Sequence, residues 1–200
     1  MGSYTANQMI LDSQKTAKAI SIVGHPLLFG NAYVIFMSFK NLDRNTAILV
    51  SLLVILLVAV PIIWHNWKKM KKGEYSNFDV SDQKQRMGFY PFAISLFVVL
   101  LMAFWVLKFP EEVIRQTLVF FVMVLTMALA NLKIKASMHA GIAFYIVVNV
   151  FEIGPLPGIL ALIFALAISW SRRKMNRHNN TELVLGSLVG SIFGGIGLIV

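Results

Sequence analysis

Long runs of apolar residues make up most of the chain, and short polar segments separate them. A helix needs about 20 apolar residues to cross a hydrocarbon core of about 30 Å. Four runs have about this length: Ala19–Phe39, Thr46–Trp64, Gly88–Leu107 and Val113–Leu132. A fifth candidate, Leu183–Val200, carries no charged residue. The pattern predicts a membrane-spanning helix over each of them.

The stretch Ala140–Trp170 is also apolar, but it is too long for one straight crossing. Its middle, Gly154–Gly158, holds two prolines and two glycines, which break a helix. We therefore expect a hairpin of two short spans. The predicted fold is an all-α, polytopic transmembrane helical bundle of six to seven spans, forming a single membrane domain over residues 1–200.

Composition agrees with this fold and narrows the possible partners. Hydrophobic residues make up 58% of the chain and charged residues 14%, and the mean hydropathy is +0.73. Cysteine is absent, which excludes disulfides, thiolate metal sites and a cysteine nucleophile. The net charge of +9 must crowd into short loops at the membrane surface, so we expect the lipid bilayer as partner and no nucleic acid.

The basic residues are unequally divided between the two faces that the predicted spans define. One face has only Lys40, Arg44, Lys108 and Arg115, whereas the other fourteen of the 18 lysines and arginines lie on the opposite face, in the N-terminus, 66–87, 133–139 and 171–182. Basic loops mark the cytoplasmic side. We expect the basic face to be cytoplasmic, in a bacterial or archaeal cell membrane.

Three polar clusters share this basic face, at 79–86, 133–139 and 171–182. The predicted hairpin brings the last two together, because the chain leaves one, crosses twice and returns. A carboxylate at Glu182 that accepts a hydrogen bond from one nitrogen of His178 leaves the other nitrogen free as a nucleophile or base. His139 can then protonate a departing alkoxide. The groups expected to bind a tetrahedral anion are Lys84, Arg86, Lys135, Ser137 and Arg172.

These residues resemble the signature of the type-2 phosphatidic acid phosphatases, a superfamily that includes the vanadium haloperoxidases. The segment from Ser171 to Gly186 is similar to the family motif Ser-Arg-x5-His-x3-Asp-x3-Gly. The residues at the motif positions are Ser171, Arg172, His178, Glu182 and Gly186. The segment Ser137-Met138-His139, preceded by Ala136, stands where the family has Pro-Ser-Gly-His. The resemblance covers about the last 70 residues.

The resemblance implies a membrane phosphatase that hydrolyses the phosphate or diphosphate monoester of a lipid or isoprenoid. It implies a phosphohistidine formed on His178, orientation of that ring by Glu182, general acid catalysis by His139, and no metal or cofactor. The sequence departs from the family at Ala136, Met138 and Glu182. The family's first motif, Lys-x6-Arg-Pro, is also not intact, because six residues separate Lys84 from Pro91 and no arginine directly precedes that proline.

Other functions fit parts of the same pattern. His139, His178 and Glu182 are a two-histidine, one-carboxylate set for a metal hydrolase, although the surrounding bases favour an anion. The Asp79 and Asp82 pair is typical of prenyltransferases, but a second such motif is missing. A small transporter or channel that binds phosphate or lipid headgroups without hydrolysis is the non-enzymatic alternative.

Several of these residues also have purely structural interpretations. Glu182 fits the first turn of the last helix, after Asn180 or Thr181 as the cap. His25, before Pro26 within the first span, is either a functional group in the membrane or a histidine that packs between helices. Gly186, Gly190 and Gly194 predict a small-residue seam for close helix packing.

Overall fold

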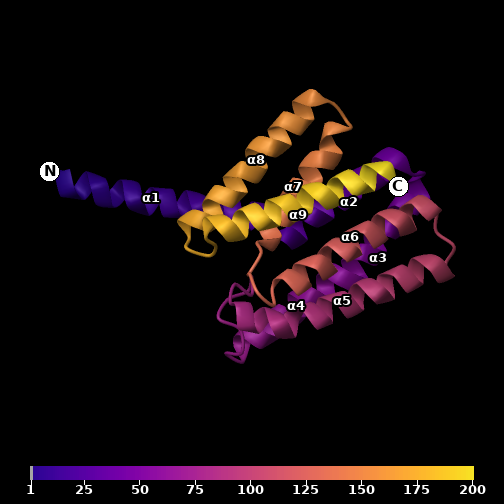
Figure 1. Cartoon of the computed structure of the whole chain (residues 1–200), viewed down its shortest axis with the longest axis horizontal. Helices are drawn as coiled ribbons and strands as arrows, with labels where there is room; N and C mark the ends of the chain where they lie inside the picture. The colour runs from indigo at the N-terminus through magenta and orange to yellow at the C-terminus, as the bar shows by residue number, and fades with distance from the viewer. Residues whose placement is uncertain (1) are drawn as a thin grey trace. The chain divides into compact units, whose positions relative to one another are not determined.

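The computed structural model describes the backbone of residues 2–200 and the side chains of residue 8 and residues 11–200. This part of the chain is helical and contains no strand (Figure 1). The all-α prediction is confirmed. The helices are α1 (Gly2–Val23), α2 (Pro26–Asn41), α3 (Arg44–Val54), the π turn η1 (Ile55–Ala59), α4 (Val60–Lys71), α5 (Gln83–Val106), α6 (Glu111–Ala130), α7 (Met138–Phe151), α8 (Pro155–Lys174) and α9 (Asn180–Ile199).

Among the described residues, five helices are long and apolar enough to cross a membrane: Arg44–Lys71, α5, α6, α8 and α9. A sixth crossing results if the bent pair Leu11–Val23 and Pro26–Asn41 is one broken span. Helix α7 is apolar but shorter. The described residues therefore contain five to six candidate spans, of which the upper value reaches the predicted range of six to seven, and α7 is an additional short apolar helix.

Two breaks interrupt the apolar runs. The predicted hairpin at Gly154–Gly158 is confirmed, because α7 ends at Phe151 and α8 begins at Pro155 after Gly154, whose φ of +155° suits glycine. The prediction of one uninterrupted span over Ala19–Phe39 is wrong. Pro26 has no N–H to donate and starts α2, so the helix axis bends by 45° there.

The helices group into two compact units. Unit 1 comprises Met1–Gly30 and Ser137–Gly194, and it contains α1, α7, α8 and most of α9. Its core consists of Ala143, Val147, Ala165 and Ile168, with α7 packed on α8 and α8 packed on α1. Small side chains in this core allow the helices to approach closely.

Helix α9 lies against α7 along the predicted glycine seam. A Cβ atom at Gly186 would lie 2.4 Å from the Ser137 carbonyl oxygen, and one at Gly190 would lie 2.0 Å from the Gly141 carbonyl oxygen. A Cβ atom at Gly194 would lie 2.9 Å from the Val148 side chain. The predicted seam is confirmed, and it holds the N-terminal ends of α7 and α9 together.

Unit 2 comprises Asn31–Ala136 and Gly195–Val200. Its α3, η1 and α4 form one continuous helix of 28 residues, in which Val60 N donates to Ile55 O just before Pro61. This π turn relieves the clash that a proline ring makes with the preceding helical turn. Helices α5 and α6 pack together, and Gln83 and Asn131 exchange side-chain bonds to each other's carbonyl oxygens.

The outer surfaces of these helices are apolar. Trp105, Leu156, Met102 and Ile163 each expose more than half of their side chain. A soluble protein rarely exposes so many large apolar residues. The surface therefore agrees with an integral membrane protein whose helices face lipid.

Candidate active site

The turn after α8 places His178 beside Arg172. Asn176 adopts a left-handed conformation with φ of +54°, and Asn176 N donates to Arg173 O at 3.1 Å. Arg177 N donates to Arg172 O at 3.0 Å, which completes a Schellman motif. His178 N also donates to Arg172 O, at 3.4 Å. The C-terminal turn of the helix therefore orients the backbone of the predicted nucleophile.

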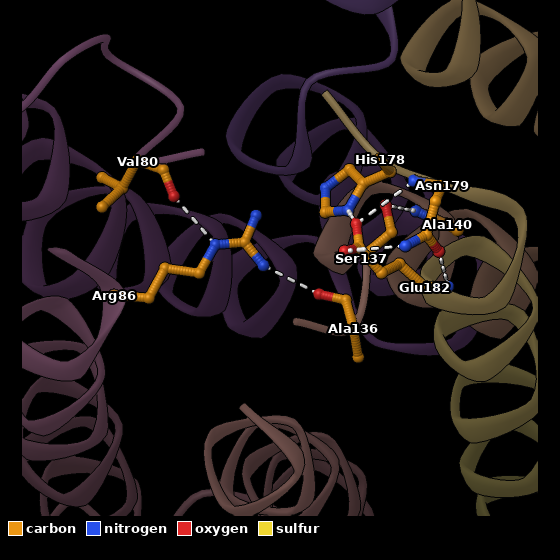
Figure 2. A network of polar contacts seen from close by, with 8 residues as sticks. All are labelled: Val80, Arg86, Ala136, Ser137, Ala140, His178, Asn179 and Glu182. Atoms are coloured by element: carbon orange, nitrogen blue, oxygen red, sulfur yellow. Dashed lines mark hydrogen bonds and ion pairs between the residues drawn. The ribbon is translucent and has the colours of Figure 1, made fainter. Parts of the chain in front are cut away.

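The predicted contact between His178 and Glu182 is present. His178 Nδ1 and Glu182 Oε2 are 2.7 Å apart, and the imidazole is buried whereas Glu182 is half-buried (Figure 2). With the carboxylate ionised, Nδ1 must carry the proton, which places the lone pair of the neutral ring on Nε2. This tautomer is the one that a nucleophilic histidine requires.

Glu182 also caps the helix that carries it. Asn179 Oδ1 accepts a hydrogen bond from Glu182 N at 2.9 Å, and Glu182 Oε2 accepts one from Asn179 N at 3.3 Å. This is a capping box, with Asn179 as the cap residue. The predicted caps, Asn180 and Thr181, are therefore wrong; Asn180 Oδ1 instead accepts a hydrogen bond from Arg173 Nε. The pattern Asn-x-x-Glu was the signal in the sequence.

The start of α7 is joined to the start of α9 through the backbone. Ser137 N donates to Glu182 O at 3.0 Å, while Ser137 Oγ caps α7 by accepting a hydrogen bond from Ala140 N. Both Ser137 and His139 are buried. The predicted hairpin thus brings residues 137–139 and 171–182 together within unit 1, as expected from the order of the segments.

Arg172 is completely buried and donates from Nη1 to the Ser21 hydroxyl oxygen at 2.7 Å. A buried guanidinium needs partners that replace water. Ser21 lies on α1, 151 residues away along the chain, and no local pattern marks it. Ser21 is therefore not among the residues predicted from the sequence.

The other three predicted phosphate ligands belong to unit 2. Lys84 is exposed and Lys135 is half-buried. Arg86 is buried, and it donates from Nε to Val80 O and from Nη1 to Ala136 O, each at 2.8 Å (Figure 2). These bonds fix the loop before α5 and the segment before α7, so Arg86 has a structural role in unit 2. Its role as a phosphate ligand stays a prediction.

Hydrogen bonds connect four of the predicted residues within unit 1: Ser137, Arg172, His178 and Glu182. His139 belongs to the same unit and lies two residues after Ser137, in the first turn of α7. In chemical terms, the unit offers an imidazole paired with a carboxylate, a second imidazole and a buried guanidinium. Comparison with family models, with curated proteins and with solved structures found no match for this chain.

Proposed function

We propose that this protein is a membrane phosphatase that hydrolyses the phosphate or diphosphate monoester of an amphiphile, either a phospholipid or an isoprenyl phosphate. The pairing of His178 with Glu182 is the observation that carries the proposal. It supplies a nucleophile of defined tautomer without serine, cysteine or a metal.

The proposed reaction has two steps. In the first, His178 Nε2 attacks phosphorus in line, the bond from phosphorus to the ester oxygen breaks, and His139 donates a proton to the leaving oxygen. In the second, water attacks the phosphohistidine, His139 accepts its proton, and inorganic phosphate leaves. Glu182 stabilises the positive charge on His178 as the bond to phosphorus forms.

Arg172 would bind the transferred phosphoryl group. Its planar guanidinium suits the oxygens of phosphate, and burial strengthens that interaction relative to water. Ser137, at the first turn of α7, would add a hydroxyl and the backbone amides of a helix N-terminus. The apolar tail of the substrate would remain in the bilayer beside the helices, with the reacting headgroup on the basic, cytoplasmic face.

The first experiment measures phosphate release by the detergent-purified protein in EDTA. Four substrates cover the proposed class: phosphatidate, lysophosphatidate, phosphatidylglycerophosphate and farnesyl diphosphate. We expect release from at least one of them, and loss of that release in His178→Ala. The matched control is His65→Gln, because His65 stacks on Phe92 in unit 2 and has no part in the proposed reaction.

Trapping of the intermediate separates this mechanism from general base catalysis by His178. Acid-labile, base-stable label should appear on the protein after rapid quenching with substrate labelled in the phosphoryl group, and it should be absent from His178→Ala. A protein that releases no phosphate from any of the four substrates would overturn the proposal and favour the transporter alternative. Release that survives His178→Ala would overturn the mechanism.

A further inference from the structure

The turn between α1 and α2 lies within unit 1 and is held firmly there. Gly24 N donates to Ile20 O at 2.8 Å, and Leu28 N donates to His25 O at 2.9 Å across the break. A Cβ atom at Gly24 would lie 2.4 Å from the Ile168 side chain of α8. The turn is therefore packed directly on the helix that carries Arg172.

Ser21 lies one turn before this break and contacts the proposed phosphate ligand. Its hydroxyl oxygen accepts the 2.7 Å bond from Arg172 Nη1, and both side chains are buried. A guanidinium is a rigid fork, so one bond of this length restricts the plane of the whole group. The bond thus fixes the direction in which the remaining N–H groups point.

His25 lies at the break itself and contacts the proposed general acid. Its Nδ1 accepts a hydrogen bond from Leu27 N at 3.2 Å, so its proton is on Nε2 when the ring is neutral. The ring meets that of His139 edge to face, with centroids 5.3 Å apart and planes at 86°. The backbone bond anchors His25, and the ring contact in turn restricts the rotation of His139.

We propose that the turn between α1 and α2 is part of the active site, where Ser21 positions Arg172 and His25 positions His139. The inference rests on the proposed phosphatase function and extends it to an element that the signature residues do not include. Both are positioning residues, because each acts through the group that it contacts.

The two contacts predict different kinetic signatures. A general acid matters most for a poor leaving group, since a good leaving group departs without a proton. Removing His25 should therefore slow an alkyl phosphate much more than an aryl phosphate. Arg172 binds the phosphoryl group whatever the leaving group is. Removing Ser21 should therefore slow both substrates alike and weaken the binding of inorganic vanadate, which mimics the transferred group.

The experiment compares kcat/KM for dodecyl phosphate and p-nitrophenyl phosphate in the full-length protein, because kcat/KM reports the first step, whereas the second step, in which His139 acts as a base, is common to both substrates. For His25→Ala we expect kcat/KM on dodecyl phosphate to fall about 10- to 100-fold, the effect of a misplaced catalytic group, with at most a threefold change on p-nitrophenyl phosphate. His25→Phe retains an aromatic edge against His139 and should recover part of the lost rate. Recovery by phenylalanine would not occur if only the Leu27 bond mattered.

For Ser21→Ala we expect both substrates to slow by about tenfold, as when one hydrogen bond to a charged group is lost. The inhibition constant for vanadate should rise by a similar factor. Ser21→Thr retains the hydroxyl and should behave like the wild type. The matched control is Ser187→Ala, which removes a hydroxyl that donates to Leu183 O within α9, and it should leave both rates unchanged.

The outcomes separate this inference from the function on which it rests. If the wild type hydrolyses neither these phosphates nor the four substrates above, the proposed function is wrong and the inference falls with it. If the wild type is active but Ser21→Ala and His25→Ala match it within twofold, only the inference is overturned. Equal losses of kcat/KM on both substrates for His25→Ala would overturn the role of His25 even if the variant is less stable, because a loss of folded protein lowers both values equally.

Discussion

The close contact between α7 and α9 makes Gly190 the most sensitive position of the glycine seam. A Cβ atom added there would lie 2.0 Å from the Gly141 carbonyl oxygen and 2.8 Å from its carbon, whereas ordinary contacts begin at 3.4 Å. The obstacle is backbone, so no side-chain rotation can relieve it. Gly190→Ala must therefore push the two helices apart by more than an ångström.

The cost can be worked from this geometry. Overpacking of a closely packed interface costs about 1–3 kcal/mol, and a rigid backbone obstacle places Gly190→Ala at the upper end of that range. Alanine recovers about 1 kcal/mol of helix propensity relative to glycine. The expected net loss is about 2 kcal/mol. For a chain of this size, that corresponds to a fall in Tm of about 4–8 °C.

The assay is thermal unfolding in detergent, followed by the fluorescence of the native tryptophans. The matched control is Gly195→Ala on the same helix, where an added Cβ atom meets no atom within 4 Å. This control gains helix propensity without a clash, so its Tm should be unchanged or higher. Equal Tm values for the two variants would refute the close approach of α7 and α9 at this position.

Four further predictions test the site and the helix ends. Gly186→Ala should lower activity more than its loss of stability explains, because the added Cβ atom would displace the Ser137 backbone. The measurement is kcat per folded protein, and a fall in activity that only matches the fall in folded protein would contradict the prediction. Glu182→Gln keeps an acceptor for the capping box but loses the charge beside His178, so kcat should fall about 10²- to 10⁴-fold with little change in Tm. A near-normal kcat would show that catalysis does not need the pairing of His178 with Glu182. Asn176→Val should lower Tm because a β-branched residue disfavours φ of +54°, whereas Asn176→Gly should not, and identical Tm values would argue against the left-handed turn. Hydrogen bonds from the side chain and then the backbone of Thr46 lower the pKa of Asp43, the N-cap of α3. The stabilisation from this cap is therefore fully present above the unfolded-state pKa of about 4 and is lost as the pH falls through the lower folded-state pKa. Asp43→Asn should flatten that part of the plot of Tm against pH, and an unchanged slope would contradict this prediction.

Local properties of the sequence determined the fold class and much of the candidate site. The length of an apolar run determines whether it can span a bilayer. The two prolines and two glycines of Gly154–Gly158 determine where the chain must turn within the longest apolar run. The spacing of His178 and Glu182 is four residues, so their contact needs only the start of α9. Glycines four residues apart must share one helix face, which made the seam visible before its partner helix was known.

Only the tertiary structure decided which distant groups meet. Nothing near Ser21 in sequence indicates that its hydroxyl accepts a bond from Arg172, because the partner lies 151 residues further along the chain. The bend after Val23 was missed because a single Pro26 within an apolar run is compatible with either a kink or a new helix. Arg86 had the same basic character as the other candidate ligands, and its bonds to two backbone carbonyls became apparent only once the chain was folded. Charge and hydropathy determine where a residue lies relative to the membrane, whereas its partners depend on how the helices pack.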